Sequence, residues 1–554
     1  MKDTLQSAVK NALQQCYCAK SLTSDTYPDF AIEVPNHSEH GDFAVNVAMM
    51  LAKAEKMAPR KIAEILVHEL KSEDSIWSRV EIAGPGFINF FLTPSCWYRV
   101  LENVYRAKEH YGASTLGEGK KVQVEFVSAN PTGPLHIGHG RGAATGDAVA
   151  SILQESGYEV QREYYINDAG NQMDTLGRSI YLRYLEVHGR KIEFPGDCYQ
   201  GEYIIEIARQ IADAQGATLL EQDEHKAVAY CARLGGEQIR AQIDSDLQRF
   251  GIGFDNWYSE QSLYDRGLVA CGIETLTSGG YTYTEDGALW LRTTDFGDDK
   301  DRVLVRANGA TTYFASDIAY HQEKYARGFD TVIDVWGADH HGYVPRMKAM
   351  LAALGKEPER LQIILVQLVN LLRAGEQVAM STRGGTFVTL REVLDEVGKD
   401  ACRFFFLMRR SDSQLDFDLE LAKQQNSENP VYYVQYAHAR VCSINQKASE
   451  AGINPAAATH ADVARLTLDE ELALAKMLNR YPEVVEAAAQ NHEPHRLTFY
   501  LQDLAAKFHS YYNQHRVIVE DPEMTRARLY LVNAVKIVLG NALRVLGISA
   551  PEQM

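Results

Sequence analysis

The strongest constraint on the fold is a stretch in which an apolar run, a proline- and glycine-rich loop and a helical pattern follow one another. The apolar run covers residues 122–127, the loop holds Pro131 and Pro134, and helical spacing begins near Gly142. Similar apolar runs lie at 160–166, 331–336 and 361–368, with helical stretches between them. Strands that alternate with helices pair in parallel, so the chain is predicted to contain an α/β domain with helices on both faces of a parallel sheet.

The chain before this domain is predicted to form a smaller unit. Residues 1–112 show helical patterns at 5–22 and 43–70, and an apolar stretch at 80–92 that indicates strands around a glycine turn. Three glycines at 112–119 are typical of a linker. A small N-terminal α/β domain is therefore expected.

The remaining chain divides into two further parts. Residues 113–425 are predicted to form the parallel-sheet domain, interrupted by a largely helical insertion at about 179–299. Residues 426–554 show no strand pattern and are rich in Ala, Leu and Tyr at helical spacing. An all-α domain is expected at this end.

The charge restricts how the chain can meet its partners. The 554 residues carry a formal net charge of −18, so RNA could be bound only through local basic and aromatic surfaces and not through an overall positive field. Neither an apolar run of about 18 residues nor an apolar leader is present, so a cytoplasmic protein without membrane contact is expected. The eight cysteines form no Cys-x-x-Cys pair, and no metal site is predicted.

Three loops follow predicted strands, at residues 128–142, 337–343 and 373–386. Ligands of parallel sheets bind beyond the carboxyl ends of the strands, where such loops meet helix N-termini. In the first loop, His136 and His139 suit hydrogen bonding to a phosphate, and Gly138 leaves the backbone open to a flat base. The polar residues of the loop at 337–343 are equally consistent with ligand contacts and with a polar surface loop, whereas the loop at 373–386, judged alone, is more often a surface turn.

Several motifs point to one family. His136-Ile-Gly-His139 resembles the HIGH signature of class I aminoacyl-tRNA synthetases, and Ala379-Met-Ser-Thr-Arg383 lies where that class has its KMSKS loop. The wider similarity is to the arginyl-tRNA synthetases. It rests on multi-residue stretches in the expected order, at 41–46, 125–134, 313–317, 338–343, 430–440 and 541–554. The resemblance implies a class I Rossmann-type catalytic domain, an N-terminal domain that contacts the tRNA elbow and an α-helical anticodon-binding domain.

The resemblance also implies a reaction. Arginine attacks the α-phosphate of ATP, giving arginyl-adenylate and pyrophosphate, and the arginyl group then moves to the arginine tRNA. Mg²⁺ is implied with ATP, and the family's tendency implies a monomer. His136, His139 and Arg383 are the implied catalytic residues. The implied ATP contacts are Pro131, Gly138, His139, Gly140, Asp339, His340, Met380 and Ser381.

Arginine selection needs carboxylates that match a planar guanidinium. The family-matching acids are Glu125 and Asp317, with Tyr313 one helical turn before Asp317. Judged from the residues alone, Glu125 would more often be a strand-end salt bridge and Asp317 a helix N-cap. The implied arginine-binding set is Glu125, Asn130, His136, Tyr313, Asp317 and His341.

One departure from the family concerns the KMSKS loop. Ala379 and Thr382 stand where that motif has lysines, and Gly133 stands where some arginine enzymes carry a compensating lysine before HIGH. The pyrophosphate-stabilising cation must then come from elsewhere, and Arg383 and Arg141 are the candidates.

The tRNA contacts that the resemblance implies are Asp42, Phe43, Asn46, Tyr432, Gln435, Arg440, Tyr512 and Met554. Asp42 and Phe43 are equally consistent with a helix cap and a core residue. A stripe of cations and aromatics at 492–516, with Tyr500, Phe508 and Tyr511 among them, suits either stacking on unpaired bases or a helical core.

Three alternative functions share parts of this pattern. A dinucleotide-dependent oxidoreductase would use Gly138-x-Gly140-x-x-Ala143, but ten residues separate that motif from Val127, whereas the fingerprint follows its strand at once. A small-molecule nucleotidyltransferase also uses His-x-Gly-His but needs neither the insertion nor the helical domain. A non-enzymatic RNA-binding paralogue is supported only by the altered KMSKS loop.

Overall fold

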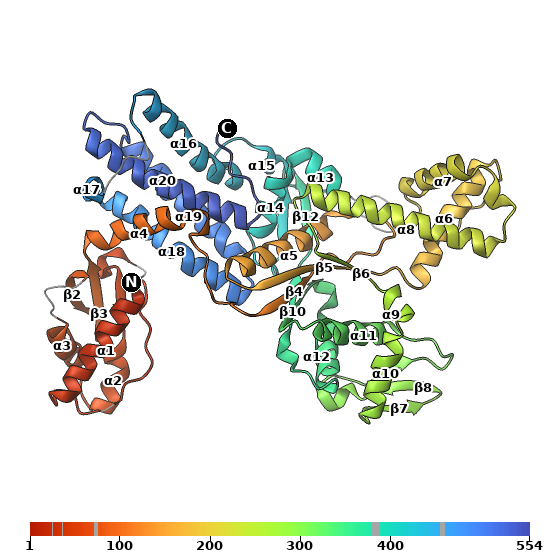
Figure 1. Ribbon diagram of the computed structural model, residues 1–554, viewed down its shortest axis with the longest axis horizontal. Helices are drawn as coiled ribbons and strands as arrows, with labels where there is room; N and C mark the ends of the chain where they lie inside the picture. The colour runs from red at the N-terminus through yellow and green to blue at the C-terminus, as the bar shows by residue number, and fades with distance from the viewer. Residues whose placement is uncertain (25, 36, 71–75, 379–387, 455–459) are drawn as a thin grey trace. The chain divides into compact units, whose positions relative to one another are not determined.

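The structure is a computed structural model that describes residues 1–554 apart from 25, 36, 71–75, 379–387 and 455–459 (Figure 1). The chain divides into two compact units. The smaller unit contains Met1–Arg106, Gly452–Asn479 and Arg516–Leu531, and the larger contains Ala107–Ala451, Arg480–His515 and Val532–Met554. Over the described ranges, no helix is both long and apolar enough to span a bilayer.

The smaller unit is built on a three-stranded antiparallel sheet. Its order is β1-β3-β2, with the bounds Phe43–Val45, Phe87–Leu92 and Trp77–Ala83. Its helices include α1 (Lys2–Cys18), α2 (Val47–Glu55), α3 (Pro59–Glu69), α4 (Pro94–Ala107), α17 (His460–Val463) and the 3₁₀ turn η1 (Ser38–His40). The first parts of α18 (Asp469–Asn491) and α20 (Pro522–Val545) also belong to it.

The predicted helix over 43–70 is wrong at its start. Phe43 and Val45 pair with Phe90 and Ile88 of β3, and all three residues of β1 are buried. A segment of three residues is too short to show a hydrophobic period, so the sequence could not distinguish a buried strand from the buried face of a helix. The helical remainder is split where Lys56 is left-handed and Pro59 opens the next helix.

The larger unit contains the predicted parallel sheet. Its order is β11-β10-β4-β5-β6, with the bounds Leu361–Val366, Thr331–Gly337, Lys121–Glu125, Glu159–Ile166 and Asn256–Ser259. Every neighbouring pair is parallel. Four strands match the predicted apolar runs. The fifth, β6, lies inside the stretch predicted as an insertion, and its residues Asn-Trp-Tyr-Ser carry no apolar run.

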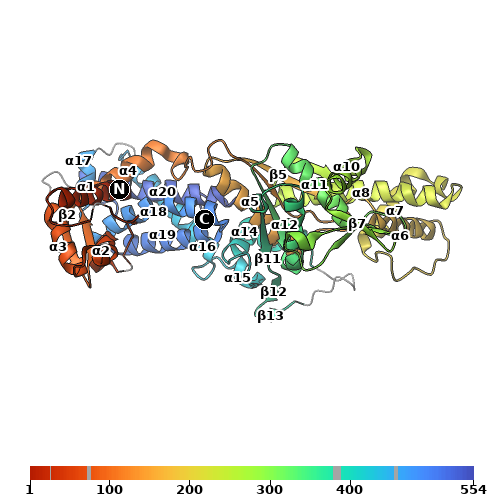
Figure 2. The same ribbon diagram turned by 90° about the horizontal axis from the view of Figure 1, so that it is seen from below.

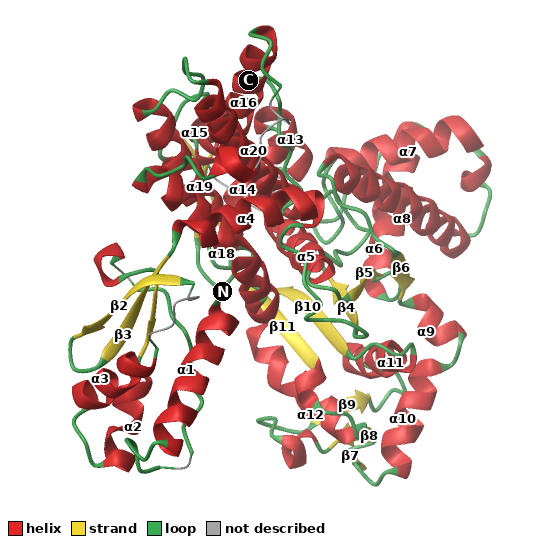
Figure 3. Ribbon diagram, turned by 60° about the vertical axis from the view of Figure 1, so that its left-hand side comes forward, coloured by secondary structure: helices red, strands yellow, loops and turns green. Residues whose placement is uncertain are grey.

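Helices cover both faces of this sheet, as predicted (Figure 3). Helix α5 (Ile137–Glu155) packs so closely that a Cβ on Gly146 would lie 2.3 Å from the ring of Phe126. Helices α11 (Tyr313–Ala326) and α12 (Val344–Ala353) share one core with Val332 and Leu361 of the sheet. Glycine at position 146 therefore sets how near the helix with the His-x-x-His motif comes to the strands.

The stretch predicted as an insertion contains two substructures. Helices α6 (Asn171–Val187), α7 (Glu202–Gln215) and α8 (Glu224–Arg249) pack on one another, and they stand together in both views of the ribbon (Figure 2). After β6 come α9 (Gln261–Asp265), α10 (Leu268–Ser278) and an antiparallel sheet of β7 (Thr282–Glu285), β8 (Ala288–Leu291) and β9 (Arg302–Val305).

The rest of the larger unit follows the parallel sheet in the chain. A small sheet combines β13 (Glu376–Gln377), β12 (Val369–Arg373) and β14 (Leu415–Asp418), and the helices beside it are α13 (Leu390–Val397), α14 (Lys399–Leu407) and α15 (Leu419–Lys423). The regular elements described beyond residue 426 are helical, and the larger unit includes α16 (Pro430–Glu450) and α19 (His495–Gln514). This agrees with the predicted all-α end.

Candidate functional site

The two histidines lie at the start of α5, just beyond the carboxyl end of β4. His136 is the N-cap residue, and its Nδ1 accepts a hydrogen bond from the backbone N–H of Gly138 at 3.1 Å. Nδ1 of His139 accepts in turn from the N–H of His136 at 3.3 Å. The two rings stack with centroids 3.6 Å apart. The motif therefore builds its own capping box, and both rings are fixed by backbone groups.

These contacts also fix which nitrogen carries the proton. Burial lowers the pKa of His136, and burial together with the neighbouring ring lowers the pKa of His139 to about 3. Both rings are thus neutral near pH 7, and a neutral imidazole that accepts at Nδ1 carries its hydrogen on Nε2. The pair presents two Nε2–H donors at a helix N-terminus, an arrangement suited to phosphate oxygens.

The glycines of the motif serve packing as well as access. A Cβ at Gly140 would lie 2.7 Å from Leu390 of α13, so glycine allows α5 and α13 to approach. A Cβ at Gly138 would lie 3.0 Å from the ring of His136. The glycine predicted to leave room for a base therefore also leaves room for the capping imidazole.

Arg141 is not the pyrophosphate-binding cation, and this prediction is corrected. Its side chain is fully buried, and its guanidinium donates to the carbonyls of Gln367, Ser413 and Arg410 at 2.8–2.9 Å. It lies one residue beyond the first turn of α5 on the buried side of the helix, where it joins separate loops through their backbones. The other candidate, Arg383, lies outside the described residues, as do Met380 and Ser381.

The segment that follows the third predicted loop lies next to the histidine motif. His136 forms a β-bridge with Thr389, and the N–H of Leu390 donates to the carbonyl of Leu135 at 2.8 Å. Thr389 is itself the N-cap of α13. The segment that follows residues 379–387 is thus anchored beside His136, as expected if both loops border one crevice.

A cavity of about 400 Å³ opens at the carboxyl ends of β4, β10 and β6. Its size falls within the range of small-molecule sites. Of the predicted site residues, the structure brings Glu125, Tyr313, Asp317 and His340 to its wall. The wall also contains residues that the sequence did not single out, among them Ser128, Tyr165, Asn167, Glu260, Trp336 and Tyr343.

Three carboxyl groups face this cavity. Asp317 lies in the second turn of α11, so it is not a helix N-cap, and its Oδ2 accepts from the Tyr343 hydroxyl at 2.7 Å. Glu260 is 3% exposed and follows β6 directly. Burial raises the pKa of Glu260 to about 7, and the Asp317 carboxylate adds to this rise. Burial also raises the pKa of Asp317. Acids held this way favour a cationic ligand, which relieves their repulsion and desolvation.

Glu125 belongs to a buried ion-pair network with Lys324 and Asp334. Lys324 is fully buried and donates to Glu125 Oε2 at 2.5 Å and to Asp334 Oδ1 at 2.9 Å. Burial alone would lower the pKa of Lys324, but the two carboxylates raise it. The other oxygen of Glu125 accepts from Ser128 at 2.9 Å. Glu125 is therefore both the strand-end salt bridge and a wall of the cavity.

Several predicted residues lie outside the lining of this cavity. Asn130 donates its amide to Gln172 at 2.6 Å, and His341 is exposed with Nδ1 near the carbonyl of Ala338 at 3.1 Å. Asp339 is exposed beside His340, and Pro131 is buried. His340, one of the implied ATP contacts, lines the cavity. Glu260 directly follows the carboxyl end of β6, where ligands of parallel sheets bind, so it could have been predicted as a site residue if β6 had been predicted as a strand.

The helical end of the chain gathers aromatic and cationic side chains. The Arg440 guanidinium lies 4.5 Å from the ring of Tyr436 and 4.8 Å from that of Tyr512, and it contacts His509 at 3.1 Å. Tyr432 stacks near Tyr436 at 5.9 Å. This group, here called the tyrosine–arginine cluster, contains Tyr432, Tyr436, Arg440, His509 and Tyr512.

Other predicted tRNA contacts have structural partners. Gln435 is buried and donates to Asp400 and to the carbonyl of Ser549 at 2.9 Å, so it holds the C-terminal tail. Met554 is 49% exposed. In the stripe at 492–516, the aromatic rings of Tyr500, Phe508 and Tyr511 are core residues. The core interpretation is correct for these three.

The predicted contacts of the N-terminal unit lie mostly within its fold. Phe43 is 2% exposed and stacks on Trp97, so its side chain is a core residue. Asp42 accepts from the N–H of Leu92 at 2.8 Å and forms an ion pair with Lys476 at 2.5 Å. Asn46 is the N-cap residue of α2. The tRNA role of the three stays a prediction, and the structure gives Phe43 no exposed ring for it.

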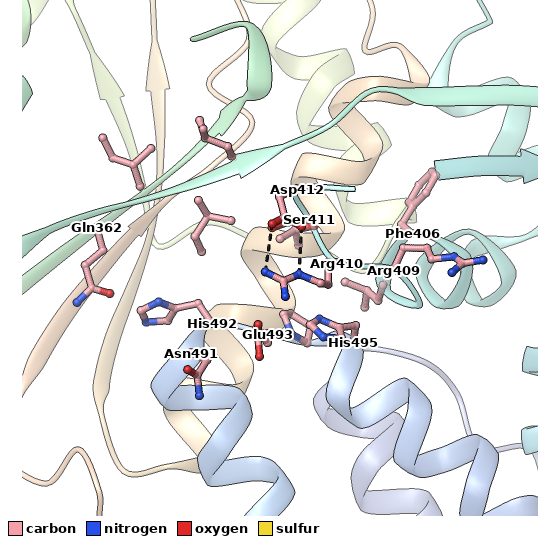
Figure 4. Close-up of a pocket in the computed structure, with 16 residues that line it drawn as sticks. Gln362, Phe406, Arg409, Arg410, Ser411, Asp412, Asn491, His492, Glu493 and His495 are labelled. Carbon is pink, nitrogen blue, oxygen red and sulfur yellow. Dashed lines mark hydrogen bonds and ion pairs between the residues drawn. The ribbon is translucent and has the colours of Figure 1, made fainter. Parts of the chain in front are cut away.

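A second cavity, of about 370 Å³, lies along the edge strand β11 and shares no lining residue with the first. His492, in the turn before α19, and His495, the first residue of α19, line it opposite Gln362 (Figure 4). Between them lies Arg410, which is paired with Asp412 at 3.1 Å. Two histidines of the predicted RNA-binding stripe thus face a mixed polar cavity and not the tyrosine–arginine cluster.

Comparisons with known proteins agree with this geometry. Three family models match successive parts of the chain: Arginyl tRNA synthetase N terminal domain at 3–92, tRNA synthetases class I (R), catalytic domain at 100–426, and DALR anticodon binding domain at 434–554. The predicted domain boundaries at 112 and 425 stay predictions.

Individual relatives match over their whole length. The arginine–tRNA ligase of Syntrophotalea carbinolica is 66% identical over 554 residues, with 100% of both chains covered. That of Citrifermentans bemidjiense is 60% identical over 558 residues, again with 100% of both covered. The solved Thermus thermophilus arginyl-tRNA synthetase covers 100% of both chains with a TM-score of 0.76 at 24% identity, a likeness in fold. The chain therefore belongs to the arginyl-tRNA synthetases, and the family and the class I fold predicted from the sequence are both confirmed.

Proposed function

We propose that the cavity at the ends of β4, β10 and β6 binds L-arginine, and that the chain joins it to the arginine tRNA at the expense of ATP. The observation that carries this proposal is the set of three carboxyl groups, Glu125, Glu260 and Asp317, on the wall of one cavity. Arginine brings two cationic ends to such a wall, and its guanidinium offers donors in a planar fork that pairs with carboxylates.

The three carboxyl groups have different neighbours, and we infer that they act differently on the bound arginine. Glu125 forms an ion pair with the buried ammonium of Lys324, which fixes the position of its carboxyl group. Glu260 and Asp317 are coupled acids with raised pKa values, and a guanidinium between them would restore both charges. An uncharged side chain of the same shape would leave them unpaired, which supports strong discrimination without an editing step.

ATP is assigned to the start of α5. Nε2–H of His136 and of His139 would stabilise the negative charge that develops on the α-phosphate oxygens as arginine attacks. Mg²⁺ prefers oxygen ligands and commonly binds through substrate phosphates and water, so we assign it to the phosphates of ATP, where it would offset their charge. The cation for the leaving pyrophosphate is assigned to Arg383.

The tRNA is assigned to the helical end and the N-terminal unit. The tyrosine–arginine cluster combines rings and a guanidinium, the combination that stacks on unpaired bases. A protein with a net charge of −18 needs such local contacts to hold RNA. Tyr432, Arg440 and Tyr512 of this cluster remain proposed anticodon contacts, and Met554, whose side chain is exposed, remains a further proposed tRNA contact.

Isotope exchange between pyrophosphate and ATP tests this function. We expect exchange only when arginine, ATP, Mg²⁺ and arginine tRNA are all present, as the family resemblance implies. Lysine in place of arginine should give none, since an ammonium does not fill a site built for a planar fork. Exchange with lysine but not with arginine would overturn the assignment of the cavity.

The pKa of Glu260 predicts how arginine affinity depends on pH. With a pKa of about 7, Glu260 is largely protonated at pH 6, and arginine must displace that proton to bind. The KM for arginine should therefore rise as pH falls through 7, approaching tenfold for each further unit, and level off above pH 8. Steady-state kinetics from pH 5.5 to 8.5 measure this.

The variant Glu260→Gln is the control for this pH effect. It removes the titrating group, so its KM for arginine should be higher at pH 8 but nearly independent of pH between 6 and 8. The KM for ATP of the unmodified protein should change little over the same range, because His139, with a pKa of about 3, stays neutral there. An arginine KM that does not vary with pH in the unmodified protein would contradict this role of Glu260.

A further inference from the structure

The loop between β4 and α5 begins with a strained backbone. Val127 and Ser128 both have positive φ values, of 68° and 39°. A β-branched residue rarely adopts this conformation, and it persists only where the surrounding structure holds it. Both residues line the proposed arginine cavity, and the same loop runs on to His136. What holds this loop therefore affects both substrates.

Three side chains from other elements hold the loop. The hydroxyl of Tyr164, on β5, donates to the carbonyl of Ala129 at 2.8 Å. The hydroxyl of Tyr203, on α7, donates to the carbonyl of Thr132 at 2.7 Å. From α6, Gln172 accepts from the amide of Asn130 at 2.6 Å. Two of the three restraints thus come from helices that contribute nothing to the lining of the arginine cavity.

Local sequence directs Tyr203 onto the loop. A Cβ at Gly201, the N-cap residue of α7, would lie 2.2 Å from the Tyr203 ring, so the ring folds back across the start of its own helix. On the other side, a Cβ at Gly133 would lie 3.1 Å from the Tyr203 hydroxyl. Glycine at positions 133 and 201 allows the Tyr203 hydroxyl to reach Thr132. The Tyr203 side chain thereby covers Gly133, which lies before the histidine motif.

We propose that Tyr203 is a positioning residue of the ligation reaction, which acts through Thr132 to set the loop and, with it, His136 and His139. The inference rests on the proposed function, since it concerns the histidines that contact ATP. Helix α5 begins five residues after Thr132, and Pro134 stiffens the connection between them. A displacement of Thr132 is thus passed to the cap of α5. Catalytic donors lose most of their effect when they move by about 1 Å.

Tyr203→Phe tests the proposal, because it removes one hydroxyl and leaves the ring. Tyr184→Phe is the matched control: its hydroxyl donates to the carbonyl of Gly216 at 2.6 Å, within the same group of helices but away from the loop. We expect Tyr203→Phe to lower kcat/KM for ATP about five- to tenfold, the equivalent of one hydrogen bond. Tyr184→Phe should change it less than twofold. Thermal unfolding of the two variants should shift by similar amounts.

A second variant and a second measurement complete the test. Gln172→Met removes the hydrogen bond to Asn130 and should also lower kcat/KM for ATP. The effects of Tyr203→Phe and Gln172→Met should not be additive in the double variant. Hydrogen exchange of the amides at 131–139 should be faster in Tyr203→Phe than in Tyr184→Phe, and this readout does not depend on turnover. Equal kinetics and equal exchange in the two tyrosine variants would overturn the proposal. Failure of the unmodified protein to charge tRNA would instead count against the proposed function.

Discussion

Asp317→Asn should lower kcat/KM for arginine by about 10²- to 10³-fold, because it removes one charge from a buried site built for a cation. The substitution keeps the shape of the side chain, and the asparagine can still accept from Tyr343, whose hydroxyl lies 2.7 Å from Oδ2 in the native structure. What is lost is the charged partner of the guanidinium. Steady-state aminoacylation with varied arginine measures the effect, and the KM for ATP should change little.

The neutral arginine analogue citrulline makes this test more specific. In the native protein, citrulline leaves Glu260 and Asp317 without a cation and should bind far more weakly than arginine. In Asp317→Asn the preference for arginine over citrulline should shrink, since one of the two acids is gone. Asp265→Asn, an exposed acid on α9, is the control and should leave both values unchanged. A loss of less than threefold in Asp317→Asn would remove Asp317 from the arginine site.

His139→Ala should lower kcat by about 10²-fold or more, with a modest change in the KM for ATP. The reason is that an Nε2–H donor aimed at a developing phosphate charge acts mainly in the transition state. Because burial holds the pKa of His139 at about 3, the loss should be the same at pH 6 and pH 8. Single-turnover formation of the adenylate measures this step directly.

The control for His139→Ala must account for the helix cap, because Nδ1 of His139 accepts from the N–H of His136. Losing a cap costs about 1 kcal/mol of stability. Asp223→Ala removes the cap of α8, where Asp223 accepts from the N–H of Lys226 at 3.3 Å, and should cause a similar stability loss without slowing turnover. A His139→Ala protein with unchanged kcat would show that the ring serves only as a cap.

The sequence predicted four of the five parallel strands because each of them appears as an apolar run. These are β4, β5, β10 and β11, whose side chains are mostly buried or half-buried. Strand β6 was missed because its four residues include only two aromatics between Asn256 and Ser259. Because β6 was not predicted, Glu260 was not predicted either. It directly follows the carboxyl end of β6, where ligands of parallel sheets bind.

The surroundings of Arg141 and Phe43 could not be predicted from residue type and position in a motif. They depend on residues far away in the chain. The carbonyls that bind Arg141 belong to residues 367, 410 and 413, and the strand that buries Phe43 begins at Phe87. Local patterns do not encode such partners.

By itself, the sequence determined the family, the strand–loop–helix order and the pair of histidines at the start of α5, because these are local in the chain. Only the tertiary structure decided that Glu125, Glu260 and Asp317 share one cavity and that Lys324 supports one of them. It also decided that Tyr203 holds the loop before the histidines. These groups come from elements separated by many tens of residues, and only the packing of these elements brings the three acids to one cavity and brings Lys324 and Tyr203 within hydrogen-bonding distance of their partners.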